Sequence, residues 1–356
     1  MNKSILASTR FLGPKEDMCP GDLRGHILAY LPLPDLISLS NVSSGEGEIK
    51  EHLRSRVCRA LAKVGVDPES LLNVMRKTGA VISGSTALEV VVPGSCTPND
   101  INLYCPQGKA VETSDLLLED DAYEKIRSPE GARLSERIRV ETFDLNNGVS
   151  QILRFKHKSG ASLNLMESLS HSPLAPIFFF HNTILMNCIT SDEVISFYPL
   201  STSSLTGLKN NRSARPSTHS PEKLKKWETW GFNIFTSCDA DHANHVFWNP
   251  TPKHGFCHFE YRSTNDRHCA RMTFSSVHGP KLTGPNLCWR LGFDTRQGNT
   301  TTRNSPVVVI STTGWPKDCA TKATAQSGNI IWHTYTAPLL SDAESIDPCL
   351  WKRSFP

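Results

Sequence analysis

The sequence predicts an α+β protein in which a short helical unit precedes a domain with a mixed sheet and a C-terminal region rich in strands and loops. Three observations support this prediction. Leucines recur at helical spacing near the N-terminus, with prolines between two short helices. A strand, a Gly-Ser turn, a helix and a second strand follow one another in residues 79–104. Short apolar runs between Gly, Pro, Asn and Thr occupy the last third of the chain.

Length and composition are those of a folded chain. The 356 residues give two or more units, at about 150 residues per domain. Hydrophobic residues make up 38% of the chain, which is enough to form a core. The net charge of +3 is close to balance and gives no reason to expect a nucleic-acid partner. The expected segments are a flexible tail at 1–18, a helical unit at 19–62, a central domain at 70–200, a polar linker at 201–223 and a strand- and loop-rich region at 224–356.

The same composition favours an intracellular protein, cytoplasmic or nuclear. No stretch reaches the length of about 18 apolar residues that a membrane helix needs. The N-terminus lacks the apolar run of a secretory signal. The 11 cysteines have no tight paired spacing, which favours free thiols in a reducing compartment. We therefore expect no membrane partner.

Residues 19–43 predict two short helices separated by a proline break at Pro32 and Pro34. Asp35 suits the start of the second helix, and the spacing of apolar residues gives each helix one apolar face. The stretch is similar to an F-box, a helical module that docks a Skp-type adaptor in cullin ubiquitin ligases. The alternative is a hairpin that only packs on the next domain. The resemblance implies that the adaptor-binding residues, partly exposed in the isolated chain, are Leu31, Leu33, Leu36 and Leu39.

Residues 79–104 resemble the signature of the nucleotidyltransferase superfamily, which has a Gly-Ser at a strand-to-helix turn and then two acids one residue apart on the next strand. Gly84 and Ser85 form the turn here, and Asp100 stands at the first acidic position. The resemblance implies a phosphate at the turn, where glycine lets the anion approach the backbone and helix amides face it. The alternative is a plain strand-to-helix turn that binds nothing.

Two of the three acids that this resemblance implies are replaced by amides. Residues two apart on a strand point to the same face, so Asn102 takes the place of the carboxylate that should accompany Asp100. Asn164, on an expected strand at 161–166, takes the place of the third acid, and Glu167 should point to the other face. Nucleotidyl transfer needs two divalent ions held by carboxylates. We therefore expect no cofactor, and magnesium only if the domain is an enzyme.

The resemblance extends over residues 71–232 to a group of uncharacterised fungal proteins, several of which begin with an F-box-like segment. They share the Gly-Ser turn, an Asp-rich strand, a Phe-His-x-Thr-x-x-Met-Asn core and a Tyr-Pro exit. A buried, hydrogen-bonded His181 is expected rather than a catalytic base. A segment like residues 261–266 recurs in that group without an assigned physical role. The matching positions of this chain are Phe180, His181, Thr183, Met186, Asn187, Tyr198 and Pro199.

Residues 238–269 are rich in cysteine and histidine. A structural zinc ion needs four such ligands in a tetrahedron. The chain has no Cys-x2-Cys knuckle there, so surface histidines and buried thiols are the alternative. The candidate zinc ligands with chelate spacing are Cys238, His242, His254 and Cys257.

Three functions follow as hypotheses. The first is a non-enzymatic F-box-type adaptor, in which the helical unit docks a Skp-type subunit and the rest presents a recognition surface. The second is a divergent metal-dependent nucleotidyltransferase that uses Asp100 with another acid, such as Asp144 or Glu141. The third is a module that holds a nucleotide or phosphate without turnover. Asn102 and Asn164 argue against the second, because a single carboxylate binds magnesium weakly.

Overall fold

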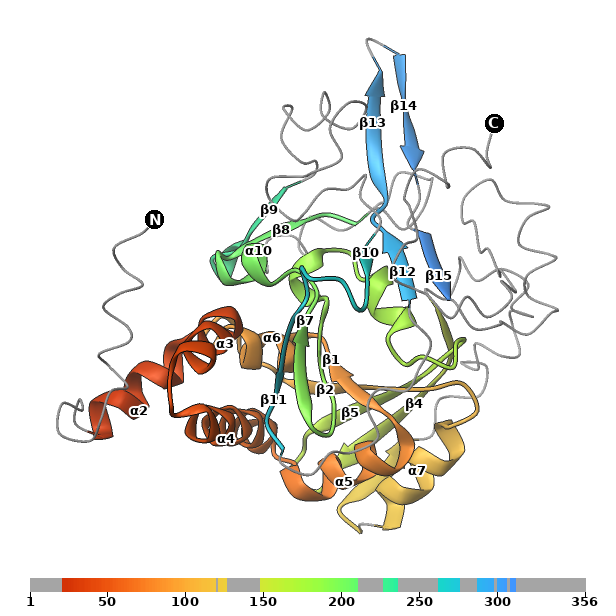
Figure 1. The fold of residues 1–356 in the computed structure, drawn as a ribbon. Coiled ribbons are helices and arrows are strands. Elements are labelled where there is room, and N and C mark those ends of the chain that lie inside the picture. The colour runs from red at the N-terminus through yellow and green to blue at the C-terminus, as the bar shows by residue number, and fades with distance from the viewer. Residues whose placement is uncertain are drawn as a thin grey trace, which may run out of the picture.

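The structure is a computed structural model that describes residues 21–119, 121–126, 148–210, 227–235, 262–275, 287–297, 300–305 and 308–311. A mixed sheet crosses the middle of the molecule, with helices below and beside it and the C-terminal strands above it (Figure 1). The predicted α+β class is confirmed. None of the described helices combines the length and the hydropathy that crossing a membrane requires.

The N-terminal stretch forms the two predicted short helices, and two more helices follow them. Pro32 precedes the second helix, and Gly65, with a φ of 89°, ends the third by donating its N–H to the carbonyl of Ala62. Asp67 begins the fourth, and its carboxylate accepts the N–H of Ser70 at 2.8 Å. These helices are α2 (Gly21–Tyr30), α3 (Leu33–Val42), α4 (Glu46–Val64) and α5 (Pro68–Thr78).

The predicted succession of strand, turn, helix and strand is present in residues 79–104. The first four residues of β2 alternate: Ile101 and Leu103 face one side of the sheet, whereas Asp100 and Asn102 face the other. The elements from this point are β1 (Val81–Ser83), α6 (Ser85–Val91), β2 (Asp100–Cys105), α7 (Ala110–Glu119), β3 (Tyr123–Ile126), β4 (Val149–His157) and β5 (Ser162–Ser168).

Residues 175–208 continue with short helical turns and strands. The predicted polar linker does not begin at residue 201, because 201–208 form the end of a helix and a strand. Their polar groups have partners there: Thr206 donates its hydroxyl to the Ser201 carbonyl, and the Thr183 hydroxyl accepts the N–H of Leu208. Residues 211–226 lie outside the described part of the chain. The elements are η2 (Ala175–Phe179), η3 (Thr183–Leu185), β6 (Asn187–Ile189), β7 (Glu193–Ser196), α10 (Pro199–Ser203), β8 (Thr206–Leu208) and β9 (Asn233–Phe235).

The C-terminal region is rich in strands, as predicted. The ring of Trp289 stacks on Phe178 with centroids 3.9 Å apart, so this region packs against η2, the helical turn between β5 and β6. Its strands are β10 (Arg262–Ser263), β11 (Ala270–Thr273), β12 (Leu287–Arg290), β13 (Phe293–Gln297), β14 (Thr300–Ser305) and β15 (Val308–Ser311).

The central sheet of the described residues has eight strands in the order β11-β7-β6-β1-β2-β5-β4-β3. β2 and β5 are parallel, and the other neighbouring pairs are antiparallel. α7 lies in the crossover between β2 and β5, which parallel strands require. The sheet thus places a polar position of β2 directly beside one of β5.

The N-terminal helices share one hydrophobic core with this sheet. Arg56 of α4, which is 5% exposed, donates to the carbonyls of Leu28 at 2.6 Å, Leu31 at 2.9 Å and Val90 at 3.1 Å. One guanidinium therefore joins α2, the turn before α3 and α6. The predicted helical unit and central domain pack as one body.

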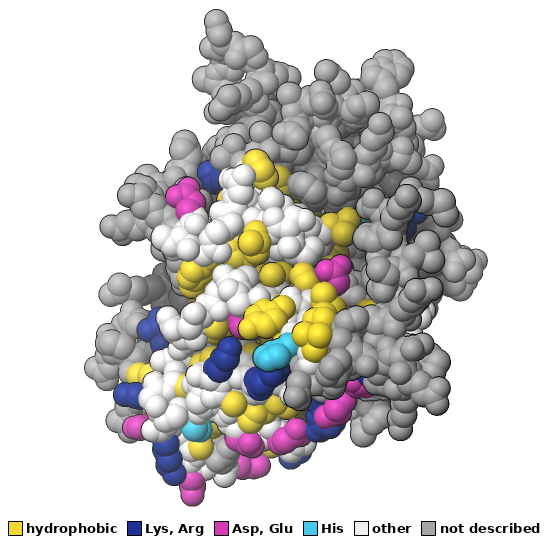
Figure 2. All heavy atoms as spheres, turned by 90° about the vertical axis from the view of Figure 1, so that its left-hand side faces the viewer, with side chains coloured by type: hydrophobic (Ala, Val, Ile, Leu, Met, Phe, Trp, Pro, Cys, Tyr) yellow, Lys and Arg dark blue, Asp and Glu magenta, His cyan; other side chains and the backbone are white. Residues whose placement is uncertain are grey.

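The prediction that the α3 leucines are partly exposed is wrong. Leu33 and Leu36 are fully buried and Leu39 is 9% exposed, whereas Leu31 is half-buried. The reason is long-range packing, because α3 lies against β11 and α10, which come much later in the chain. On the face that contains these helices, Figure 2 shows apolar side chains in separate small patches beside basic side chains and a histidine.

Candidate functional site

Three predicted site residues meet on one face of the central sheet. Asn164 of β5 lies opposite Asn102 of β2 in the parallel register, and Asp100 lies opposite Ser162. The Asn164 Nδ2 donates to Asp100 Oδ2 and to Asn102 Oδ1, at 3.1 Å in each case. All three side chains are half-buried. Asp100, Asn102 and Asn164 therefore form a single cluster, which we call the amide cluster.

The Gly-Ser turn adjoins the amide cluster. β1 ends at Ser83, which pairs with Asn102. Gly84 follows with a φ of 81°, and a Cβ placed on it would lie 3.4 Å from the Asn102 Nδ2. Glycine adopts such a φ without the steric cost that other residues meet. Ser85 is the first, half-buried residue of α6, so the predicted turn and the predicted acidic positions lie together.

The donor set of the amide cluster does not fit a pair of magnesium ions. Asp100 supplies the one carboxylate, and hard divalent ions prefer carboxylate oxygens. The Asn164 amide directs its hydrogens at the oxygens of Asp100 and Asn102, where a cation would have to bind. Among the described residues, no group of three or more His, Cys, Asp or Glu side chains is placed to hold a metal ion.

Glu167, the other acid of β5, faces the opposite side of the sheet, as predicted. Its Oε1 accepts the N–H of Gly108 at 2.6 Å, and its Oε2 accepts from the Ser150 hydroxyl at 2.8 Å and the Gln151 amide at 2.6 Å. The carboxylate thus holds the loop that leads into α7. Asp144 and Glu141, the other candidate acids, lie outside the described residues.

Two cations of β4, which are not among the predicted site residues, lie beside the amide cluster. Arg154 lies opposite Asn164, and Lys156 lies opposite Ser162, in the antiparallel register of β4 and β5. Residues paired in this way project from the same face, with Cβ atoms about 5 Å apart. Both side chains are exposed. In the sequence, Arg154 and Lys156 alternate with the apolar Phe155, and this pattern indicates that the two cations share one face of a strand.

An apolar stretch of the same sheet face bounds the cluster at Tyr104, two residues along β2 from Asn102. Its ring is buried and meets Phe180 edge-on, with centroids 6.1 Å apart. Burial, with a smaller contribution from the nearby charge of Asp100, raises the pKa of the Tyr104 phenol well above its ordinary value. The phenol therefore stays neutral at physiological pH. The Asn102 amide and the two cations beside the cluster can therefore donate hydrogen bonds to an anion, whereas the Asn164 amide already donates within the cluster.

His181 is hydrogen-bonded, as expected, and a tryptophan is one partner. Its Nε2 accepts the indole N–H of Trp227 at 3.1 Å, and the side chain is half-buried rather than buried. The neighbouring Asn187 donates its amide to the Ile184 carbonyl at 2.7 Å. These bonds tie residues of the predicted core motif to the surrounding structure.

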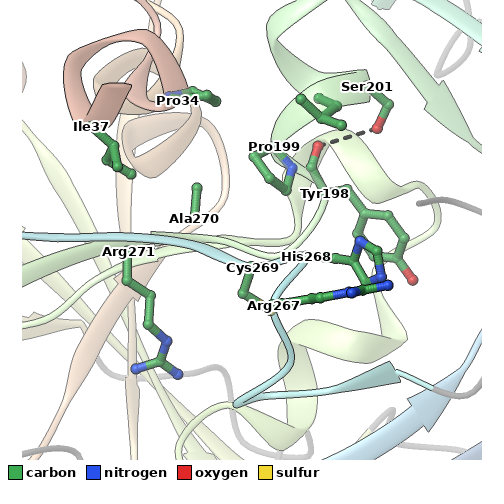
Figure 3. Close-up of a pocket in the computed structure, with 11 residues that line it drawn as sticks. Pro34, Ile37, Tyr198, Pro199, Ser201, Arg267, His268, Cys269, Ala270 and Arg271 are labelled. Carbon is green, nitrogen blue, oxygen red and sulfur yellow. Dashed lines mark hydrogen bonds between the residues drawn. The ribbon is translucent and has the colours of Figure 1, made fainter. Parts of the chain in front are cut away.

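A separate cleft of about 380 Å³ lies between α3, α10 and residues 267–271 (Figure 3). Its walls combine apolar residues of α3 and α10 with Arg267, His268 and Arg271. No residue of the amide cluster lines it. Local sequence patterns do not indicate this cleft, because its walls come from distant parts of the chain.

The candidate zinc ligands Cys238, His242, His254 and Cys257 lie outside the described residues. The described cysteine of that stretch, Cys269, has its thiol 3.4 Å from the Asp266 Oδ1. Burial first, and then the Asp266 charge, raise the pKa of this thiol to about 12, so it stays protonated.

No protein-family model, curated protein or solved structure matches this chain.

Proposed function

We propose that the central domain is a nucleotidyltransferase-like domain without transfer chemistry, and that its amide cluster binds a phosphate-bearing ligand, such as a nucleotide, without turnover. The observation that carries this proposal is the pair of hydrogen bonds from Asn164 to Asp100 and Asn102. The three expected acidic positions lie together, and the Asn164 amide donates to the oxygens that a metal ion would need as ligands.

The order of elements supports the same proposal. β1, the Gly84 turn, α6, β2 and the parallel β5 follow the sequence that the family resemblance implies. A fold does not supply an activity, so the function rests on the chemistry of the site. The phosphate would lie where Arg154 and Lys156 project beside the amide cluster. Arg donates bidentate, charge-assisted hydrogen bonds to phosphate, and these do not need a metal ion.

Calorimetric titration of the full chain with ATP tests this function. We expect saturable binding that is unchanged by a chelator, because the site holds the phosphate through Arg154, Lys156 and the Asn102 amide. Arg154→Gln should weaken binding about tenfold. Lys77→Gln, which removes an exposed cation of α5, is the matched control and should leave binding unchanged. Absence of binding, binding that requires a divalent ion, or nucleotide incorporation by the purified chain would each reject the proposal.

A second function, the F-box-type adaptor, has one observation in its favour. Leu23, Tyr30 and Val42 of α2 and α3 are 50%, 71% and 49% exposed, so this pair of helices keeps apolar side chains at the surface although its leucine stripe is buried. Apolar side chains on a helix are a common anchor for protein partners.

A pull-down with a Skp-type adaptor distinguishes this function from a purely structural hairpin. The adaptor should be retained by the wild-type chain and lost with Tyr30→Asp. Val111→Asp, which places the same charge at a 68% exposed apolar position of α7, should retain it. Failure of the wild-type chain to retain the adaptor would end the hypothesis.

A further inference from the structure

The cleft between α3, α10 and residues 267–271 has the size of a small-molecule site. Its volume of about 380 Å³ falls within the usual range of about 300–1,000 Å³ for such pockets. Figure 3 shows Pro34 and Ile37 toward one end of the cleft, with Arg271 below Ile37, Arg267 and His268 toward the other end, and Pro199 and Ala270 between them. The two ends therefore differ in chemistry.

The polar end carries positive charge without a compensating acid in the lining. Arg271 is engaged, since it donates to the Thr264 carbonyl at 2.7 Å and to Glu193 at 3.3 Å. Arg267 is exposed, and within the described residues its side chain has no hydrogen bond or ion pair. His268 lies next to it. Arg267 is thus the cation that can bind an incoming anion.

A buried ion pair fixes the loop that presents these cations. Arg262 is 3% exposed and donates to Asp266 Oδ1 at 2.9 Å. The same carboxylate accepts the backbone N–H of His268 at 2.9 Å and lies 3.4 Å from the Cys269 thiol. The loop around Arg267 is therefore held in one conformation before any ligand arrives, which lowers the entropic cost of binding.

The same ion pair joins the two walls of the cleft. The guanidinium of Arg262 lies 5.0 Å from the ring centroid of Tyr198, a lining residue, and donates to the Phe197 carbonyl at 3.0 Å. Segment 261–266, which has no role assigned from its sequence, thus contributes Arg262 and Asp266 as the support of this cleft.

The other end of the cleft presents apolar surface to solvent. Leu200 of α10 is 62% exposed, and Pro34 and Ile37 are half-buried. We propose that the cleft binds a small organic anion, with its carboxylate or phosphate head at Arg267 and His268 and its apolar body against Ile37, Pro199 and Leu200.

The test uses four probes and the full chain, with calorimetry as the measurement. Phenylacetate and phenyl phosphate carry both features of the proposed ligand, whereas inorganic phosphate lacks the apolar body and benzyl alcohol lacks the charge. Both aromatic anions should bind at least about tenfold more tightly than either single-feature probe. The tighter of the two identifies the preferred head group. Lack of saturable binding by the aromatic anions, or equal affinity for inorganic phosphate, would overturn the proposal.

Variants assign the binding to this cleft. Arg267→Gln should weaken phenyl phosphate binding about tenfold, because it removes the charge of the head-group site. Leu200→Ser should weaken phenyl phosphate but leave inorganic phosphate unchanged. Lys77→Gln, which removes an exposed cation of α5 outside both sites, is the matched control and should leave phenyl phosphate binding unchanged. An unaltered affinity of Arg267→Gln for phenyl phosphate would refute the proposal, whatever the outcome for ATP. Thermal unfolding of each variant verifies its fold.

Discussion

Asn164 donates one side-chain amide group to both Asp100 and Asn102, at 3.1 Å in each case. A neutral amide thus links the residues of adjacent parallel strands where the family resemblance implies a third carboxylate. The cluster contains a single acid, so it needs no ion to relieve repulsion between acids.

The double substitution Asn102→Asp with Asn164→Asp should create a magnesium site. Three carboxylates would then converge, and their mutual repulsion should destabilise the chain in a chelator. Added magnesium should restore stability, because a ligand that binds only the folded state raises the unfolding temperature. Calorimetry and thermal unfolding measure the two effects. Asn41→Asp with Asn73→Asp makes the same charge change at exposed positions and should gain no magnesium response; a shared response would contradict convergence.

Leu36→Ala should destabilise the protein by about 3 kcal/mol, because it leaves a cavity in a fully buried position between α3 and its neighbours. Leu23→Ala, at a position that is 50% exposed, should change stability by less than about 0.5 kcal/mol. Urea unfolding followed by circular dichroism measures both values. Equal effects would mean that α3 does not pack as described.

Gly84→Ala should destabilise the protein by about 1–2 kcal/mol. The positive φ of Gly84 strains any side chain, and the new Cβ would contact the Asn102 amide. Gly25→Ala is the control, since Gly25 lies within α2 with open space around its Cα. That change should stabilise the helix by about 0.5–1 kcal/mol. Thermal unfolding should therefore move in opposite directions for the two variants, and a gain for Gly84→Ala would disprove the strained turn.

His52→Gln should reduce the loss of stability in mild acid. Burial first, and then the charges of Arg56 and Arg59, lower the pKa of His52 from 6.5 to about 4 in the folded state. The unfolded chain therefore binds a proton that the folded chain excludes between these two values. Stability should fall as the pH drops from about 6.5 to about 4, and less steeply in the variant. Urea midpoints across this range measure the slope, and His26→Gln, at an exposed position of α2, should retain the wild-type slope.

Asp266→Asn should destabilise the protein by about 3 kcal/mol at neutral pH, because it leaves the buried Arg262 without its counter-ion. Burial alone would raise the pKa of Asp266, but the hydrogen bond and charge of Arg262 lower it below its ordinary 3.8. Its stabilising effect is therefore complete above that value and is lost as the pH falls through the folded pKa.

Guanidinium unfolding at several pH values tests this assignment. The wild type should lose stability below about pH 4, and Asp266→Asn should lack that component. Asp35→Asn changes an exposed carboxylate of α3 and serves as the control. A pH profile of Asp266→Asn identical to that of the wild type would show that Asp266 is not the group that titrates.

Local sequence patterns were enough to predict the central part of the site. The period of two in β2 placed Asp100 and Asn102 on one face, and the apolar alternation of β5 placed Asn164 on a comparable face. The Gly84 turn followed from the strand-to-helix pattern. These features depend on neighbours in the chain, so periodicity alone reveals them.

Features that depend on pairing between distant segments could not be predicted in this way. Arg154 joins the amide cluster only because β4 is the antiparallel neighbour of β5, with one particular register. The cleft needs α10 and residues 267–271 to meet α3. The same limit made the α3 leucines look available to a partner, because an apolar stripe has the same spacing whether it meets another chain or its own.

The packing of α3 against β11 has a consequence for protein synthesis. α3 leaves the ribosome early together with its neighbour α4, whereas β11, which also packs on α3, is translated much later. During that interval the part of α3 that β11 covers is open to chaperones and to other nascent chains. A product cut short before residue 270 would leave that part uncovered, so premature termination should yield a more aggregation-prone fragment.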